Sequence, residues 1–218
     1  CSLIFYLMEL LDVHTHHLST YPGRSILNLM PGDLCPTGEV YCSVGIHPWQ
    51  IDEYEEEVIW EQLLLSLKDP CVIAIGEAGI DKLISVSLVK QLAVFEKQIV
   101  LSEEKQLPLI IHCVHAVNEI IQLKKKYAPH MPWVIHGFRG KKELALQCVN
   151  HHIFLSFGEK YNEEALKGIP LSSILMETDE SKADITCLYD KAAKLLSLSA
   201  DDLKLQIQQN INRVFFDH

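Results

Sequence analysis

Short apolar runs of strand length alternate along this chain with longer segments of helical periodicity. The run at residues 70–76 is almost entirely apolar, as expected of a strand that is buried on both faces of a parallel sheet. Apolar side chains recur at helical spacing over residues 86–105, and Pro108 ends that segment just before the next apolar run at 109–111. A strand, a helix and a second strand in this order are typical of a parallel βαβ unit.

The same pattern extends over the whole chain. The expected strands are residues 10–16, 25–30, 39–46, 70–76, 109–111, 133–135, 153–157 and 173–176. The expected helices are residues 52–68, 86–105, 116–127, 141–150, 186–196 and 201–216, the last with Ser199 as its N-cap. Eight strands that mostly alternate with helices predict an α/β protein with a (β/α)8 TIM barrel.

The length of the chain limits how this barrel is built. At 218 residues it lies near the lower bound of roughly 200 for such barrels, so we expect one domain over residues 1–218. The stretch between the first two strands is too short for a full helix, which predicts a lean barrel that is distorted after its first two strands. Residues 1–7 precede Met8 as a possible extension, and they resemble neither a signal peptide nor a membrane span.

Charge and cysteine content restrict the classes of partner and the compartment. The net charge is −10 and the chain has only three arginines, so it lacks the basic surface of proteins that bind duplex nucleic acid non-specifically. An anionic substrate would need a local positive centre, such as metal ions. The odd number of cysteines and the absence of a CxxC pair predict reduced, buried thiols in a cytoplasmic protein. The seven are Cys1, Cys35, Cys42, Cys71, Cys113, Cys148 and Cys187.

Side chains that bind metal ions follow the expected strands. His14 and His16 are two residues apart, which points both imidazoles to the same side of a strand. Six of the eight strands carry such a residue at or just beyond the carboxyl end. These residues are His14, His16, His47, Glu77, His112, His136 and Asp179. Since the carboxyl ends of barrel strands meet on one face, where active sites of this fold lie, the sequence predicts a single site there.

Four imidazoles and two carboxylates make a mixed nitrogen and oxygen donor set, which suits zinc, manganese or magnesium. The set is large enough for two divalent ions, one bound by the two N-terminal histidines with Asp179 and one by the two later histidines. Glu77 would bridge the two ions. The predicted ligands are His14, His16, Glu77, His112, His136 and Asp179. The residual positive charge of such a centre would attract phosphate oxygens.

Several motifs together resemble the TatD-type metal-dependent hydrolases. They lie at residues 12–16, 45–48, 76–81, 91–98, 107–112, 136–140, 177–179 and 212–215. The resemblance implies a barrel-fold metal enzyme, and many members of this family are deoxyribonucleases with exonuclease activity. The ligand roles given above match the family pattern position by position. The departures are Val114-His115-Ala116 in place of the common Arg-Asp-Ala, and trimmed loops, including a short loop without arginine after Asp179.

The predicted function is therefore a two-metal-ion hydrolase that cleaves phosphodiester bonds, a deoxyribonuclease acting on the ends of DNA or a related nucleotide. A hydroxide bridging the metals would be the nucleophile, with Asp179 as base or proton shuttle and Glu77 as the catalytic bridge. His115 and Arg139 are candidate substrate contacts beyond predicted ligands. His47, just outside the ligand set, is expected either to contact substrate or to orient a ligand.

Two other functions fit the same residues. The first is an amidohydrolase-like enzyme that cleaves a C–N or ester bond, because a metal pair polarises carbonyl groups as well. Against it, the middle strands carry Glu77 rather than a lysine that could be read as a carboxylated bridge. The second is a metal-binding protein without turnover, in which the trimmed loops no longer form a pocket. The sequence leaves the oligomeric state open.

Overall fold

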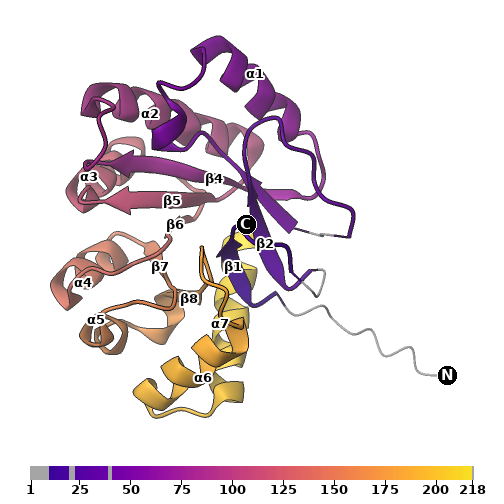
Figure 1. Cartoon of the computed structure of the whole chain (residues 1–218). Coiled ribbons are helices and arrows are strands. Elements are labelled where there is room, and N and C mark those ends of the chain that lie inside the picture. Colours follow the sequence, from indigo (N-terminus) through magenta and orange to yellow (C-terminus); the bar gives the residue numbers. More distant parts are fainter. Residues whose placement is uncertain (1–9, 20–22, 39–40, 218) are drawn as a thin grey trace.

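The computed structural model describes residues 10–19, 23–38 and 41–217, so the extension at residues 1–7 lies outside the described part. Eight strands form one sheet in chain order, each parallel to the next, and helices lie around them (Figure 1). The strands are β1 (Asp12–Thr15), β2 (Ser25–Leu29), β3 (Tyr41–Val44), β4 (Val72–Asp81), β5 (Leu109–Val114), β6 (Trp133–Ile135), β7 (Ile153–Phe157) and β8 (Ile174–Met176).

The first and last strands meet and complete the barrel. Thr15 and Asp179 form a parallel bridge. The backbone N–H of Asp179 donates to the carbonyl of His14 at 2.9 Å, and the N–H of His16 donates to the carbonyl of Asp179 at 3.1 Å. The structure therefore confirms the predicted (β/α)8 barrel.

A helix follows most of the later strands. The α-helices are α1 (Glu56–Ser66), α2 (Leu88–Lys105), α3 (Val117–Tyr127), α4 (Lys142–Asn150), α5 (Glu163–Gly168), α6 (Ile185–Leu196) and α7 (Ala200–Phe215). Two 3-10 turns, η1 (Pro48–Gln50) and η2 (Leu171–Ser173), complete the set. As expected, the described residues between β1 and β3 contain no helix. Ser199 caps α7 as predicted, accepting a hydrogen bond from the N–H of Asp202.

The sequence missed α5 and placed two strand ends too early. α5 has only six residues, too few to show helical periodicity, although Asn162 caps it. β4 continues five residues past the predicted end at residue 76, and β5 continues three past residue 111. Glu77 and His112 therefore lie within strands, because the backbone ladder continues through them while their polar side chains enter the site. The longer strands are visible in Figure 1.

A glycine allows β4 and β5 to stay paired where the ligands lie. Gly79 has a φ of +148°, a conformation that other residues rarely adopt. A Cβ atom at this position would lie 2.1 Å from the carbonyl oxygen of His112, far inside a van der Waals contact. Gly79 is the register partner of His112, so this close approach helps to set His112 beside Glu77.

The core contains one tryptophan and two of the cysteines. Trp133 is fully buried and packs within the core. Of the six cysteines that the structure describes, Cys42 and Cys148 are buried and Cys187 is exposed, so the expectation of buried thiols is only partly right. None of these six forms a disulfide. Within the described part of the chain, no helix combines the length and the apolar character that crossing a membrane requires.

Candidate metal centre

Glu77 lies at the centre of a cluster of histidines. Its Oε2 atom is 3.5 Å from Nε2 of His14 and 3.3 Å from Nε2 of His16. Its Oε1 atom is 2.7 Å from Nδ1 of His112 and 2.7 Å from Nε2 of His136. The two oxygens of this one carboxylate thus face different imidazoles, Oε2 those of His14 and His16 and Oε1 those of His112 and His136.

Asp179 joins the first of these pairs from the far end of the chain. Its Oδ1 atom lies 3.8 Å from Nε2 of His14 and 3.7 Å from Nε2 of His16. Asp179 has a φ of 55°, in the left-handed region that aspartate tolerates better than most residues. Its two backbone hydrogen bonds to β1 hold this conformation, so the closure of the barrel also positions the carboxylate.

His47 is closer to the cluster than the sequence suggested. Its Nε2 atom is 3.4 Å from Oε1 of Glu77, and its ring centroid is 4.4 Å from that of His112. The geometry of η1 fixes the ring, because Nδ1 of His47 accepts a hydrogen bond from the N–H of Trp49 at 3.2 Å. His47 therefore contacts the predicted bridging carboxylate directly.

The cluster has the properties of a site for divalent ions. Both ring nitrogens of His14 are buried without a hydrogen-bond partner among the described residues, and the buried Nε2 of His136 faces the Glu77 carboxylate at 2.7 Å. Leaving buried polar atoms unsatisfied is costly, and a metal ion coordinated by imidazole nitrogens removes that cost. Three groups of residues can each be drawn from this cluster such that the donor atoms within the group lie within 4.8 Å of one another. They are His14 with His16 and Glu77, His14 with His136 and Asp179, and His47 with Glu77 and His112.

The surroundings of the central carboxylate favour its ionised form. Burial raises the pKa of Glu77, but the charge of His136 and the hydrogen bonds of His112 and His136 outweigh burial and hold this pKa well below its usual value. The centre therefore combines a carboxylate with imidazole donors, a donor set that suits a divalent cation.

Two buried carboxylates near the ligands were not assigned a role from the sequence. Oε1 of Glu177 accepts a hydrogen bond from the N–H of Gly137 at 2.6 Å and lies 3.6 Å from Nδ1 of His136. Oδ2 of Asp81 lies 3.4 Å from Nε2 of His112. Each carboxylate is placed to orient one imidazole from its far side, an arrangement common around metal-binding histidines. The only indication of this role in the sequence was that Glu177 and Asp81 belong to the same motifs as the predicted ligands.

A third carboxylate connects the two ends of the chain. Asp12 accepts hydrogen bonds from the backbone N–H of Thr178 at 2.9 Å and from its hydroxyl at 2.6 Å. Burial raises the pKa of Asp12 to about 7, although these hydrogen bonds oppose the shift. Asp12 thereby links β1 to the segment that carries Asp179.

Two buried glutamines of α2 hold the backbone below the site. Gln98 accepts from the N–H of Ile46 at 2.8 Å and donates to its carbonyl at 3.0 Å. Gln91 makes the same pair of contacts with the backbone of Asp81, at 2.8 and 2.9 Å. Polar residues on the buried face of an amphipathic helix were the signal that sequence reasoning overlooked.

The predicted substrate residues lie at the rim. Arg139 is exposed and lines a cavity of about 210 Å³ that also includes Asp179 and Lys160, a cation that the sequence did not single out. His115 is exposed, at the first position past β5. Trp49 is 57% exposed, its ring centroid lies 5.1 Å from that of His47, and its indole N–H donates to Asp81 at 2.9 Å. Trp49 therefore reaches the site and is not a core residue.

Comparison with known proteins places this centre in a family. The family model described as TatD related DNase matches residues 33–216. An uncharacterized metal-dependent hydrolase, YabD of Bacillus subtilis, is 35% identical over 150 residues, which cover 64% of this chain and 58% of the relative. Deoxyribonuclease Tat-D of Schizosaccharomyces pombe is 30% identical over 175 residues, covering 72% and 55%. A 3'-5' ssDNA/RNA exonuclease TatD of Klebsiella pneumoniae is 29% identical, covering 64% and 56%.

These matches span little more than half the length of each of those relatives. Two solved structures resemble the whole fold. The TatD homologue YJJV of Escherichia coli has a TM-score of 0.82 at 19% identity, covering 95% of this chain and 98% of that chain. A TatD family hydrolase of Entamoeba histolytica has a TM-score of 0.79 at 17% identity, covering 96% and 99%. Since the family model matches residues 33–216, well over half of the chain, the chain belongs to the TatD-related DNase family.

Proposed function

We propose that this protein is a two-metal-ion hydrolase that cleaves phosphodiester bonds at the ends of DNA or a related nucleic acid. One observation carries the proposal: the two oxygens of Glu77 face two separate pairs of histidines. Two sites bridged by one carboxylate are typical of enzymes that displace groups at phosphorus. The names of the Schizosaccharomyces pombe and Klebsiella pneumoniae relatives, a deoxyribonuclease and an exonuclease, support this substrate class.

The ligands divide between the two oxygens of Glu77. The first ion would be held by Oε2 of Glu77 with His14, His16 and Asp179. The second would be held by Oε1 of Glu77 with His112 and His136, and His47 lies at the same oxygen. When bound, such ions lower the pKa of a coordinated water towards neutrality and polarise the phosphoryl oxygen under attack.

Asp179 is the residue best placed to accept a proton from the attacking water. Its side chain is 21% exposed, whereas those of Glu77 and Glu177 are 6% and 0% exposed. A base must be reachable by water and substrate, which excludes the two buried glutamates. Asp179 would receive the proton on its carboxylate while its backbone stays fixed to β1.

Substrate would be held from two sides of the centre. Arg139 and Lys160 share the cavity that Asp179 lines, and their charges suit phosphate oxygens. Trp49 stands exposed beside His47, where its ring offers a stacking surface for a terminal base. This arrangement fits a strand end better than the middle of a duplex, because a chain with a net charge of −10 is poorly suited to track a long phosphate backbone.

A substrate panel tests the proposal. The purified full chain, loaded in turn with Mn²⁺, Mg²⁺ or Zn²⁺, is incubated with end-labelled single-stranded DNA, RNA, duplex DNA, bis-p-nitrophenyl phosphate, a lactone and an amide. We expect progressive cleavage from one end of the single strand. Asp179→Asn should abolish it, while Asp190→Asn, which neutralises an exposed carboxylate on α6, should not.

The same panel separates the two alternatives. Turnover of the lactone or amide alone would replace the proposal with the amidohydrolase-like function. Two bound ions per chain with no turnover of any substrate would identify a metal-binding protein instead.

A further inference from the structure

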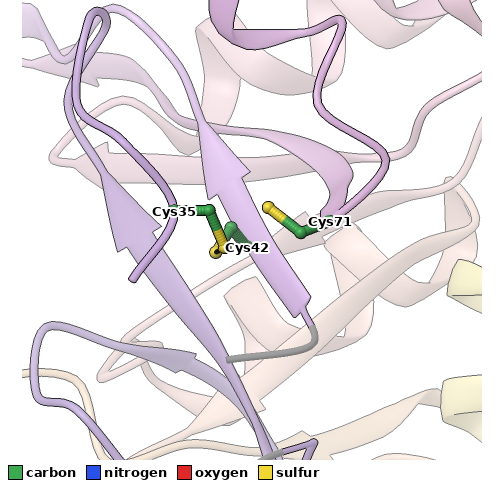
Figure 2. Close-up of side chains that lie close together, drawn as sticks. All are labelled: Cys35, Cys42 and Cys71. Carbon is green, nitrogen blue, oxygen red and sulfur yellow. Dashed lines mark hydrogen bonds between the residues drawn. The ribbon is translucent and has the colours of Figure 1, made fainter. Parts of the chain in front are cut away.

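Three cysteines that are distant in sequence meet at the opposite end of the barrel from Glu77. Cys42 is the second residue of β3, Cys71 directly precedes β4, and Cys35 lies in the connection between β2 and β3. Figure 2 shows the side chains of Cys35 and Cys71 directed toward Cys42. The three sulfur atoms lie within 4.8 Å of one another, and those of Cys35 and Cys42 are 3.3 Å apart.

The backbone fixes two of these thiols relative to each other. The N–H of Cys42 donates to the carbonyl of Cys71 at 2.8 Å, which continues the β3–β4 ladder. The N–H of Cys71 in turn donates to Oδ1 of Asp69 at 3.0 Å. Cys42 and Cys71 are therefore neighbours because the sheet makes them so.

The third thiol is carried by a connection that is attached to α1. The N–H of Gly32 donates to the hydroxyl of Ser66 at the end of α1, at 3.1 Å. A turn in which the N–H of Met30 donates to Oδ2 of Asp33 at 3.0 Å then leads the chain back toward Cys35. Cys42 is buried, while Cys35 and Cys71 are half-buried, so the cluster is held by its surroundings and remains reachable from solvent.

The spacing of the sulfur atoms suits a tetrahedral thiolate site. With zinc–sulfur bonds of about 2.3 Å, two thiolates on one tetrahedral ion lie about 3.8 Å apart. The separations in the cluster, 3.3 Å for one pair and under 4.8 Å for all, bracket that value. Small side-chain rotations would therefore place all three sulfur atoms around one ion.

We propose that Cys35, Cys42 and Cys71 form a separate metal site that binds a thiophilic ion such as Zn²⁺ through three thiolates. The fourth position is open to water or to the carboxylate of Asp69, which already accepts a hydrogen bond from Cys71. Binding releases the three thiol protons to solvent. The ion would connect the β2–β3 segment to the start of β4, in the part of the barrel where short connections replace helices.

Cadmium provides a probe that distinguishes this cluster from the centre around Glu77. Cd²⁺ bound by thiolates gives an ultraviolet charge-transfer band, whereas the centre around Glu77 contains no sulfur donor. The full chain, reduced and stripped of metal with a chelator, is titrated with Cd²⁺. We expect the band to saturate at one thiolate-bound ion per chain, and bound ion to protect Cys35 and Cys71 from alkylation.

Single variants assign the band to the cluster. Cys35→Ser and Cys71→Ser should each raise the Cd²⁺ dissociation constant by more than about tenfold, since even an outer-shell partner of a metal contributes that much. Cys187→Ser is the matched control, because this cysteine is exposed on α6 and should leave the band unchanged. Circular dichroism verifies that each variant is folded.

Two results would overturn the proposal. One is the absence of a thiolate band in the reduced protein, or a band that persists in both variants. The other is failure to bind Cd²⁺ together with formation of a Cys35–Cys42 disulfide under mild oxidation, identified by peptide mass. In that case Cys35 and Cys42 are a disulfide-forming pair next to Cys71, and the cluster is not a metal site.

Discussion

The two ends of the barrel gather different donor atoms. At the carboxyl ends of the strands, imidazole and carboxylate groups surround Glu77, and this set suits zinc, manganese or magnesium. At the amino ends of β3 and β4, the clustered donors are three thiols, which suit softer ions. The comparison shows that one closed sheet gathers two different donor sets, which would favour different ions.

The two clusters also differ in how they are assembled. The centre around Glu77 takes residues from both ends of the chain and needs the contact between β1 and β8. The thiol cluster takes one residue from the β2–β3 connection, one from β3 and one from the position just before β4. We therefore expect a substitution at Glu77 to weaken metal binding and activity at the whole centre. Substitutions at the other positions considered below should have smaller effects on activity or stability.

The largest effect is expected from Glu77→Gln, which keeps the shape of the side chain and removes the charge of the bridge. Phosphodiester cleavage should fall by more than about 10³-fold, well beyond the 10–100-fold loss typical of outer-shell changes. Metal analysis should show that ions bound at the carboxyl end are lost, while the cadmium–thiolate band at the other end is retained. Full occupancy of both predicted ions in this variant would refute the bridging role.

A smaller loss is expected from Glu177→Gln. The neutral amide still accepts a hydrogen bond from Gly137, but it no longer places a charge behind His136. Metal affinity or activity should fall by roughly 10–100-fold, the usual effect of such partners. Equilibrium dialysis and initial rates measure the two quantities. An unchanged affinity would mean that Glu177 serves the fold and not the centre.

The amino end should respond in stability instead of catalysis. Asn210 on α7 is buried and donates to the carbonyls of Leu171 and Ile174, both at 2.8 Å, at the start of β8. Asn210→Ala leaves both carbonyls without this donor and should lower the free energy of unfolding by about 1–3 kcal/mol. Urea denaturation measures this loss. The rate per folded molecule should stay unchanged, and a lowered rate would contradict the division between the two ends.

The smallest of these effects is expected from Trp49→Ala. Loss of one stacking surface costs about 1–3 kcal/mol, so KM for a single-stranded oligonucleotide should rise by at least about fivefold. The rate on bis-p-nitrophenyl phosphate, which has no base to stack, is the control and should change little. Equal losses on both substrates would indicate that Trp49 acts by positioning His47 or Asp81.

The sequence alone predicted the order of the eight strands and the residues of the candidate centre. This was possible because strand and helix periodicity depend on near neighbours, and because parallel strands deliver their carboxyl ends to one face. The same reasoning misplaced the ends of β4 and β5, since it read Glu77 and His112 as strand terminators. The polar side chains of Glu77 and the half-buried His112 are tolerated inside the barrel because side chains from other parts of the fold lie within hydrogen-bonding or ion-pair distance of them.

Only the tertiary structure determined the distances between side chains on strands that are far apart in the chain. The contact of both Glu77 oxygens with separate histidine pairs depends on barrel closure, as does the hydrogen bonding of Asp12 to Thr178. The three thiols likewise meet only in the fold, because the spacing of their cysteines in the sequence matches no metal-binding motif. Local sequence determines which side chains leave each strand, whereas the closed sheet determines which of them meet.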